Sequence, residues 1–479
     1  MTTDNLLEIS LETALTLEEL VQVRVESMGT PGIFATLFQG ERIFFEKGYG
    51  VRVSQGAVPD ADTTFRIASC TKSFTIAALL KLRDEGKLNL DQLITEFVPE
   101  FTFSTLSSAQ SIPTLRQLAS MSSGLPTDDP WADRQESITS QDLREIVRSG
   151  VNATHTTGAL FQYSNLGFAL LGLTIEIVSG RDFREFVTTE FLKPLGMNQT
   201  GFNAYDFSEK NLAKGYRKVE EGWIELPYSP SGSFSSIGGL FSSGKDLRIW
   251  SNWFYSAFTD HVENEALLSA ATRREMQFIT TPTLFNTELG TLPKNGVRIS
   301  GYGLGLFVEY DQRFGQFVSH SGGYPGFSAH MRWHVPTGLS VVVLENATYS
   351  GAMATAIKLL DTALDGLNFE ISQPKPWPVT FEFAAKAEGW LRNIKANPPL
   401  EIFSENVDLD IPFPERVASI ERLIGEVGGL KESANIVIES SDSPLHMKWK
   451  ISGNQGELLC EIRLTPNFPT HIQTFKIKQ

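Results

Sequence analysis

The spacing of Ser69 and Lys72 would bring a serine hydroxyl and a lysine amine together on one face of a helix. The apolar residues from Thr71 to about Leu82 predict such a helix, and Gly86 ends it. A serine in its first turn lies beside unpaired backbone N–H groups. A buried lysine can lose its proton far below its ordinary pKa of about 10.4 and accept the serine proton. The pair therefore predicts a serine nucleophile with a lysine base.

The same Ser-x-x-Lys pattern also begins at Ser242 and at Ser372. Prolines at 374 and 376 forbid a helix after Ser372, and Ser242 has the character of a helix N-cap. Only the Ser69 copy opens a long apolar helix after an extended stretch. The structural alternative is that Ser69 is an ordinary N-cap of a buried helix.

Tyr163 and Asn165 stand two residues apart, before an apolar helix expected over 166–178. In extended backbone, side chains with this spacing point the same way. Tyrosine can transfer a proton, and asparagine can both donate and accept hydrogen bonds. The pair suits a site that protonates a leaving group and orients a substrate carbonyl. The alternative is a packed tyrosine at a helix start, with Asn165 as the cap.

His320 stands at the end of an expected strand and is followed closely by Gly322 and Gly323. Glycines let a substrate backbone approach the strand, and the Gly323 N–H could bind an oxyanion. The glycines equally suit a plain turn, and a lone histidine at a strand end is more often structural.

The elements that must position these side chains follow from the hydrophobic pattern. A helix over 11–28 and a hairpin with strands at 33–38 and 42–46 precede Ser69. Helical segments follow Ser69. Late strands at hairpin spacing predict an antiparallel sheet, at 302–309, 316–320, 327–333 and 339–344. The fold class is therefore α+β.

Ser-x-x-Lys, Tyr-x-Asn and His-x-Gly occur here in the order that is typical of the serine β-lactamase and penicillin-binding-protein superfamily, which the chain resembles. The resemblance is closest to β-lactamase-related hydrolases with His-x-Gly in place of Lys-Thr-Gly. It covers about residues 12–365. Further stretches match in order, with a departure at 119–121 in the first: 115–126, 193–197, 238–240 and 322–327.

The resemblance implies a β-lactamase/transpeptidase-like domain, with an antiparallel sheet flanked by helices plus an all-helical region. Ser69 would attack a carbonyl to form an acyl-enzyme, with Lys72 and Tyr163 sharing the base and acid roles. The oxyanion would lie between the N–H groups of Ser69 and Gly323. Water would then release the acyl group.

By the same resemblance, Asn165 and His320 would contact the substrate, and Gly322 belongs to the substrate and oxyanion side of the site. A histidine offers less reliable positive charge than the family's lysine near neutral pH, which weighs against β-lactamase or cell-wall carboxypeptidase activity. We expect hydrolysis of an amide or ester bond in a small substrate, with a D-aminoacyl peptide or amide ahead of an ester. The alternatives are a carboxylesterase or acyltransferase, a β-lactamase, and a catalytically silent penicillin-binding-like sensor.

The charge and composition of the chain limit the kinds of partner and cofactor that it is expected to bind. A net charge of -15 and an isoelectric point near 5.1 weigh against nucleic acid and anionic membranes. No apolar run reaches the roughly 18 residues of a membrane span, and no secretory signal is visible, so a cytoplasmic location is expected. With only two cysteines, Cys70 and Cys460, no disulfide framework or metal site is suggested, and no cofactor is expected.

The domain organisation expected from the sequence is a hydrolase domain at 1–370, a proline-rich linker at 371–380 and a small α+β accessory domain at 381–479. The last domain is expected to contain two helices and four strands: 383–395, 414–427, 436–439, 445–451, 457–464 and 472–477. It could shape the active-site mouth, mediate association into a homo-oligomer, or only stabilise the chain.

Overall fold

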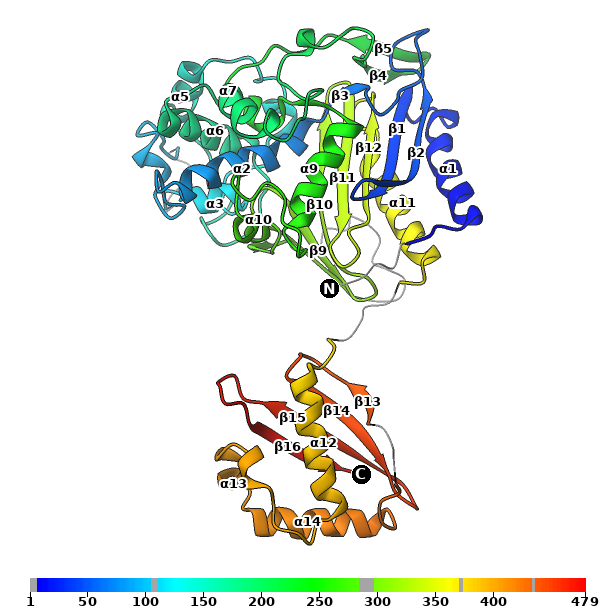
Figure 1. The fold of residues 1–479 in the computed structure, drawn as a ribbon. Coiled ribbons are helices and arrows are strands. Elements are labelled where there is room, and N and C mark those ends of the chain that lie inside the picture. The colour runs from blue at the N-terminus through cyan, green and yellow to red at the C-terminus, as the bar shows by residue number, and fades with distance from the viewer. Residues whose placement is uncertain (1–6, 105–110, 284–296, 370–373, 433–435) are drawn as a thin grey trace. The chain divides into compact units, whose positions relative to one another are not determined.

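The computed structural model describes residues 7–104, 111–283, 297–369, 374–432 and 436–479. The chain divides into two compact units, Met1–Glu370 and Ile371–Gln479 (Figure 1). Residues 371–373 of the expected linker lie outside the described residues, and a helix begins at Pro378, inside the stretch expected as linker. Each unit has its own hydrophobic core.

Eight antiparallel strands form the main sheet of the first unit, in the order β2-β1-β12-β11-β10-β9-β8-β7 (Figure 1). Their bounds are β1 (Gly32–Gln39), β2 (Arg42–Gly50), β7 (Thr281–Pro282), β8 (Arg298–Tyr302), β9 (Phe307–Asp311), β10 (Gly315–Tyr324), β11 (Phe327–His334) and β12 (Ser340–Glu345). The early β1–β2 hairpin pairs with the late strand β12. The predicted hairpin and antiparallel sheet are therefore confirmed.

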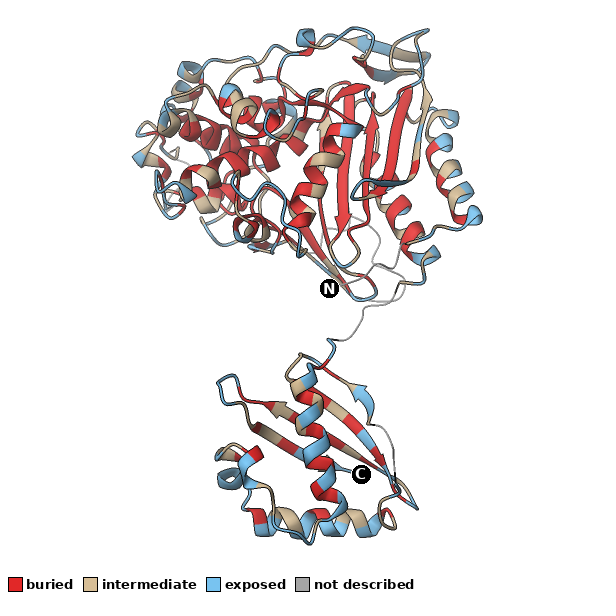
Figure 2. Cartoon of the chain, viewed as in Figure 1, coloured by how far each residue is buried: buried red, intermediate tan, exposed pale blue. Residues whose placement is uncertain are grey.

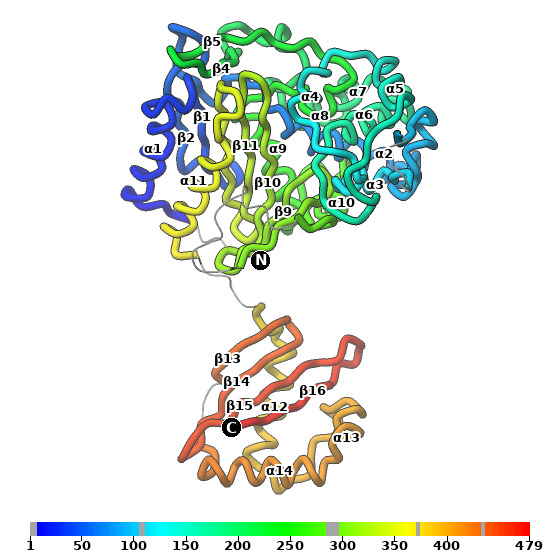
Figure 3. The backbone as a smooth tube through the Cα atoms, turned by 180° about the vertical axis from the view of Figure 1, so that it is seen from behind, coloured from blue at the N-terminus to red at the C-terminus, as the bar shows by residue number. Residues whose placement is uncertain are grey.

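Helices cover both faces of this sheet. α1 (Leu11–Glu26) and α11 (Ala352–Gly366) pack on one face, and α9 (Gly244–Ser256) crosses the other (Figures 1 and 3). As a result, β11 and β12 are buried along their whole length, as Figure 2 shows. Strands buried on both faces read as nearly continuous apolar runs, which is how they could be recognised in the sequence.

Beside the sheet lies a helical region built on α2 (Thr71–Asp84), which is buried on almost every side. α6 (Asn165–Ser179) packs along it, and both helices are confirmed as predicted from their apolar composition. The remaining elements of the first unit are short: η1 (Ala68–Cys70), η2 (Ile94–Glu96), α3 (Leu115–Ala119), α4 (Asp129–Ala132), α5 (Ser140–Arg148), α7 (Phe183–Val187), η3 (Thr188–Leu192), η4 (Ala204–Asp206), α8 (Ser235–Gly238), α10 (Ala270–Met276), β3 (Thr64–Arg66), β4 (Gly215–Val219), β5 (Gly222–Leu226) and β6 (Phe241–Ser243).

The strand expected over 302–309 is two strands in the structure. The chain reverses between β8 and β9, where Gly305 has φ +74, a backbone conformation that glycine adopts without a steric penalty. The reversal pairs Tyr302 with Phe307, whose ring centroids lie 4.8 Å apart. Both rings then flank the histidine of the third motif.

The two other Ser-x-x-Lys copies differ from the first in their local structure. Ser242 lies in β6, and its neighbour Ser243 caps α9 by accepting from the Asp246 N–H at 3.2 Å. The cap was therefore predicted one residue too early. The copy at Ser372 lies outside the described residues.

The second unit is a sheet with helices on one face (Figure 1). Its core includes Trp390 of α12 and Trp449 of β14. Its elements are α12 (Pro378–Arg392), η5 (Leu400–Ile402), α13 (Asn406–Asp410), α14 (Phe413–Glu426), β13 (Val437–Ser440), β14 (His446–Ser452), β15 (Glu457–Leu464) and β16 (Ile472–Lys478). Two helices and four strands were predicted here and are present, with α12 beginning five residues earlier than the expected 383.

Candidate active site

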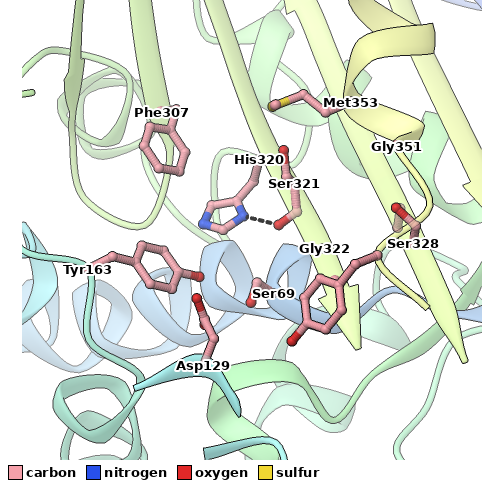
Figure 4. A pocket seen from close by; sticks show the side chains of 13 residues that line it. Ser69, Asp129, Tyr163, Phe307, His320, Ser321, Gly322, Ser328, Gly351 and Met353 are labelled. Atoms are coloured by element: carbon pink, nitrogen blue, oxygen red, sulfur yellow. Dashed lines mark hydrogen bonds between the residues drawn. The ribbon is translucent and has the colours of Figure 1, made fainter. Parts of the chain in front are cut away.

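Ser69 lies in the turn η1 that joins β3 to α2, and it lines a cavity of about 340 Å³. The residue before it, Ala68, has φ +47, a left-handed conformation that is unfavourable for any residue with a Cβ. Strained backbone of this kind is concentrated at functional sites. Tyr163, His320 and Asp129 line the same cavity and surround Ser69 in Figure 4.

The Lys72 ammonium is buried beneath Ser69, one turn into the helix. Its Nζ donates to Ser69 Oγ at 3.0 Å, to Asn165 Oδ1 at 2.7 Å and to the Ile237 carbonyl at 2.8 Å. These three acceptors use all three ammonium protons. Lys72 is therefore held in one position, with its nitrogen against the Ser69 hydroxyl, as the sequence spacing predicted.

Burial lowers the pKa of Lys72 to about 8, while the carboxylates of Asp129, Asp128 and Asp133 act in the opposite direction. At pH 7 the amine is therefore mostly protonated, and about one molecule in ten has it neutral. Only the neutral form can accept the Ser69 proton.

The pH dependence of the reaction should follow this lysine. We expect kcat/KM to rise with pH and to level off above about 8, and to fall about tenfold per pH unit below that value. Initial rates with an ester that has no ionisable group, measured from about pH 6 to pH 10 with spontaneous hydrolysis subtracted, test this. A profile that stays flat below pH 8 would rule out Lys72 as the titrating base.

The Tyr163 hydroxyl points toward Ser69 (Figure 4), and the centre of the Tyr163 ring lies 5.1 Å from Lys72 Nζ. Burial is the main cause that raises the pKa of Tyr163, with Tyr302 and Asp129 adding to it, whereas a hydrogen bond with Ser69 lowers it. The phenol is therefore protonated at neutral pH. It can hand a proton to a leaving group and recover one later.

Asn165 connects the lysine to an acidic loop. Its Oδ1 accepts from Lys72, and its Nδ2 donates to Asp129 Oδ1 at 2.6 Å and to Asp128 Oδ1 at 3.2 Å. Asp128 also accepts from the N–H groups of Asn165 and Leu166, at the start of α6. The cap of this helix is Ser164 and not Asn165. Asn165 is buried with its polar atoms in use, so its contact with substrate stays a prediction.

His320 is neutral in this structure. Its Nδ1 donates to the Ser321 carbonyl at 2.7 Å, and its Nε2 accepts from the Tyr302 hydroxyl at 3.1 Å. Burial, with a smaller contribution from Lys72, lowers the pKa of His320 to about 3. The sequence indicated a less reliable positive charge at this position, and the structure provides none at neutral pH. Its contact with substrate stays a prediction.

Gly322 and Gly323 have no side chains, which lets β10 lie close to the backbone at Ile67 and to the ring of Tyr349. A Cβ on Gly322 would lie 2.0 Å from the Ile67 carbonyl oxygen, in the chain that leads to Ser69. A Cβ on Gly323 would lie 2.3 Å from Cδ1 of Tyr349. The sequence predicted that small residues here admit a substrate. The structure adds that Gly322 allows the serine turn itself to approach the strand.

Several cavity residues were not identified from the sequence. Asp129 is the first residue of the four-residue helix α4, and Tyr349 lies after β12 with φ +47 and donates a hydrogen bond to Asp133. Phe307 and Met353 supply apolar walls. The one local signal was the Asp128-Asp129 pair, which follows the family-like stretch 115–126 after a single residue, Thr127.

The described part of the chain has neither a cluster of metal-ligating side chains nor a membrane-spanning helix. No group of three or more histidine, cysteine, aspartate or glutamate side chains is arranged there to hold a metal ion. None of the helices there is both long enough and apolar enough to span a bilayer.

A family model described as beta-lactamase matches residues 17–364. The Protein flp of Staphylococcus aureus strain COL is 27% identical over 337 residues, which are 69% of this chain and 62% of the relative. The chain therefore matches less than two thirds of that relative's length. The Beta-lactamase-like protein 2 of Dictyostelium discoideum is 28% identical over 273 residues, 54% of this chain and 47% of the relative.

Solved structures share the fold at low identity. An octameric penicillin-binding protein homologue from Pyrococcus abyssi has a TM-score of 0.63 at 21% identity and covers 96% of this chain and 99% of its own. A D-amino acid amidase from Ochrobactrum anthropi SV3 has a TM-score of 0.58 at 22% identity, over 74% and 99%. EstCE1, a hydrolase with promiscuous acyltransferase activity, has a TM-score of 0.57 at 18% identity, over 74% and 98%. These likenesses confirm the predicted fold.

Proposed function

The chain belongs to the beta-lactamase family, as its three motifs predicted, and from this premise we propose that it is a serine hydrolase that acts through an acyl-enzyme. Ser69 is the proposed nucleophile, Lys72 its base and Tyr163 the partner in proton transfer. The observation that carries the proposal is the 3.0 Å contact between Lys72 Nζ and Ser69 Oγ, made by an amine whose pKa is lowered to about 8.

In the proposed acylation, Ser69 Oγ forms a bond to the substrate carbonyl carbon while neutral Lys72 takes the hydroxyl proton. The N–H groups of Ser69 and Gly323 would stabilise the oxyanion. The bond to the leaving nitrogen or oxygen then breaks, and Tyr163 supplies the proton that the leaving group needs, with Lys72 restoring the tyrosine proton. In deacylation, water attacks the ester, and the same two side chains move the proton in reverse.

For the substrate we propose a small amide or ester, with a D-aminoacyl peptide or amide first. A cavity of about 340 Å³ is at the small end of ligand pockets. The fold is shared with a D-amino acid amidase, which supports the first choice. It is also shared with a hydrolase that has promiscuous acyltransferase activity, which supports a carboxylesterase or acyltransferase as the second choice. A β-lactamase or a silent sensor is less favoured, because neutral His320 gives no charge for a substrate carboxylate.

One panel of initial rates tests the choice among these functions. The substrates are D- and L-alanine p-nitroanilides, short-chain p-nitrophenyl esters and a chromogenic cephalosporin, each assayed with the wild type and Ser69→Ala. Ser69-dependent turnover that favours the D-anilide supports the amidase. A preference for the ester moves the assignment to esterase or acyltransferase, and turnover of the cephalosporin to β-lactamase. No turnover of any substrate favours the sensor.

The unit at 371–479 is proposed as an accessory domain that shapes the active-site mouth or mediates self-association, since a structural relative matched over almost the whole chain is octameric. Because each unit has its own core, a chain that ends at residue 369 should still fold. We expect this truncation to change the oligomeric state or the D-over-L preference, measured by light scattering and by the rate panel. If both stay the same, the unit is a stabilising appendage. A cytoplasmic location stays a prediction.

A further inference from the structure

The cavity around Ser69 has an acidic residue in its lining, and at the position where the third motif of the family commonly has a lysine it has a histidine. Its described lining includes two residues that could be charged near neutral pH, Asp129 and His320, and His320 is neutral because burial lowers its pKa to about 3. Lys72 lies behind Ser69, is not part of the cavity lining and has no exposed surface. Asp129 is therefore the charged group that a substrate would meet.

The surroundings of Asp129 leave part of its carboxylate available. Its Oδ1 accepts from Asn165 Nδ2 at 2.6 Å, while Oδ2 accepts no hydrogen bond from the described residues. The Lys72 protons go to Ser69, Asn165 and Ile237, so the lysine does not bond to Asp129. In Figure 4 the carboxylate points into the cavity, next to the Tyr163 hydroxyl and to one side of Ser69.

The two neighbouring acids have other partners. Asp128 accepts from the N–H groups of Asn165 and Leu166 and so stabilises the start of α6. Asp133 is 7% exposed and accepts from the Tyr349 hydroxyl. Asp129 thus differs from both, because it faces the space next to the nucleophile with one oxygen unused.

We propose that Asp129 binds the protonated amino group of the acyl donor and so makes the site selective for substrates with a free ammonium next to the scissile carbonyl. This rests on the proposed function, because it places the ammonium in the cavity where Ser69 attacks. An ammonium offers several N–H donors to the unused carboxylate oxygen, and charge-assisted hydrogen bonds of this type are about twice as strong as neutral ones. The same carboxylate would repel substrates with an acidic group there.

A substrate ammonium bound to Asp129 would also lower the pKa of Lys72, the proposed base. Among the groups that raise the pKa of Lys72, Asp129 is the largest. A substrate cation beside Asp129 offsets that negative charge, which favours release of the lysine proton and therefore the neutral amine that Ser69 needs. An aminoacyl substrate would in this way support its own acylation.

The test compares two nearly isosteric substrates, alanine p-nitroanilide in the enantiomer that the wild type cleaves and the lactic acid p-nitroanilide of the same configuration. We expect the wild type to favour the amine over the hydroxyl by at least about tenfold in kcat/KM. Asp129→Asn keeps the shape and can still accept from Asn165, so it should reduce that ratio to about one. The control is Asp365→Asn, whose carboxylate is on the surface, 59% exposed in its ion pair with Arg313.

The possible outcomes separate this proposal from the proposed function. Equal kcat/KM for the two substrates in the wild type would overturn the proposal, and so would equal losses of kcat/KM on both substrates in Asp129→Asn. In either case, turnover that depends on Ser69 would still support the proposed serine hydrolase function. If neither anilide is cleaved, calorimetry on Ser69→Ala decides. Alaninamide that binds at least about tenfold more tightly than lactamide, with the difference lost in the double variant with Asp129→Asn, supports ammonium binding without hydrolysis. Equal or absent binding overturns it.

Discussion

Ser69→Ala should lower kcat/KM by at least about a thousandfold on every substrate that the wild type cleaves, because no other group at this position can form the acyl-enzyme. Its thermal midpoint should stay nearly unchanged, since Ser69 lines a cavity where water can replace the hydroxyl as an acceptor for Lys72. Rates on the substrate panel and a thermal melt of both proteins provide the measurement.

A second serine in the same cavity provides the matched comparison for that result. Ser321 also lines the cavity, and its hydroxyl hydrogen-bonds to His330 Nδ1 at 2.8 Å, an arrangement that could be mistaken for a nucleophile and its base. We expect Ser321→Ala to keep activity within about tenfold of wild type. If the large loss occurs in Ser321→Ala and not in Ser69→Ala, the nucleophile has been assigned to the wrong serine.

Lys72→Ala should reduce kcat/KM to a similar extent, because the Ser69 proton then has no acceptor at 3.0 Å. The structure adds a stability effect. Removing the ammonium leaves Asn165 Oδ1 and the Ile237 carbonyl without their donor, which costs about 1–3 kcal/mol for each buried group left unpaired. Activity and thermal midpoint should therefore fall together, as rates and melts of the same preparation would show.

Lys72→Arg separates the catalytic role of this lysine from its structural one. Arginine keeps the positive charge and the donors but cannot give up its proton in a protein. We expect Lys72→Arg to be as inactive as Lys72→Ala even where its midpoint stays closer to wild type. Substantial activity in the arginine variant would mean that Lys72 contributes only its charge.

Local spacing was enough to predict the first half of the site. Ser69 and Lys72 are three residues apart at the start of an apolar helix, so their contact follows from helix geometry alone. Tyr163 and His320 are distant in sequence from this pair, and only the order of the three motifs in a known family indicated that they would meet it. The spacing of Tyr163 and Asn165 predicted neighbours, and the structure places both near Lys72.

The rest depended on tertiary contacts that carry no local pattern. Asp129 begins a helix too short to produce a hydrophobic period, and it reaches the cavity because Asp128 binds the start of α6. From the sequence, Gly322 suits a plain turn. Only the structure shows that a Cβ on Gly322 would lie 2.0 Å from the Ile67 carbonyl oxygen. The break at Gly305 was missed because the residues on either side are apolar, as in a single buried strand.

The central claim is that catalysis passes through an ester of Ser69. The most direct measurement is mass spectrometry of the protein after brief reaction with p-nitrophenyl acetate and acid quench, in wild type and Ser69→Ala. We expect one acetyl group on the wild type, located by peptide mapping to the peptide that contains Ser69, and none at that position in the variant. An acetyl group on another residue of the wild type, or the same adduct in Ser69→Ala, would contradict this mechanism.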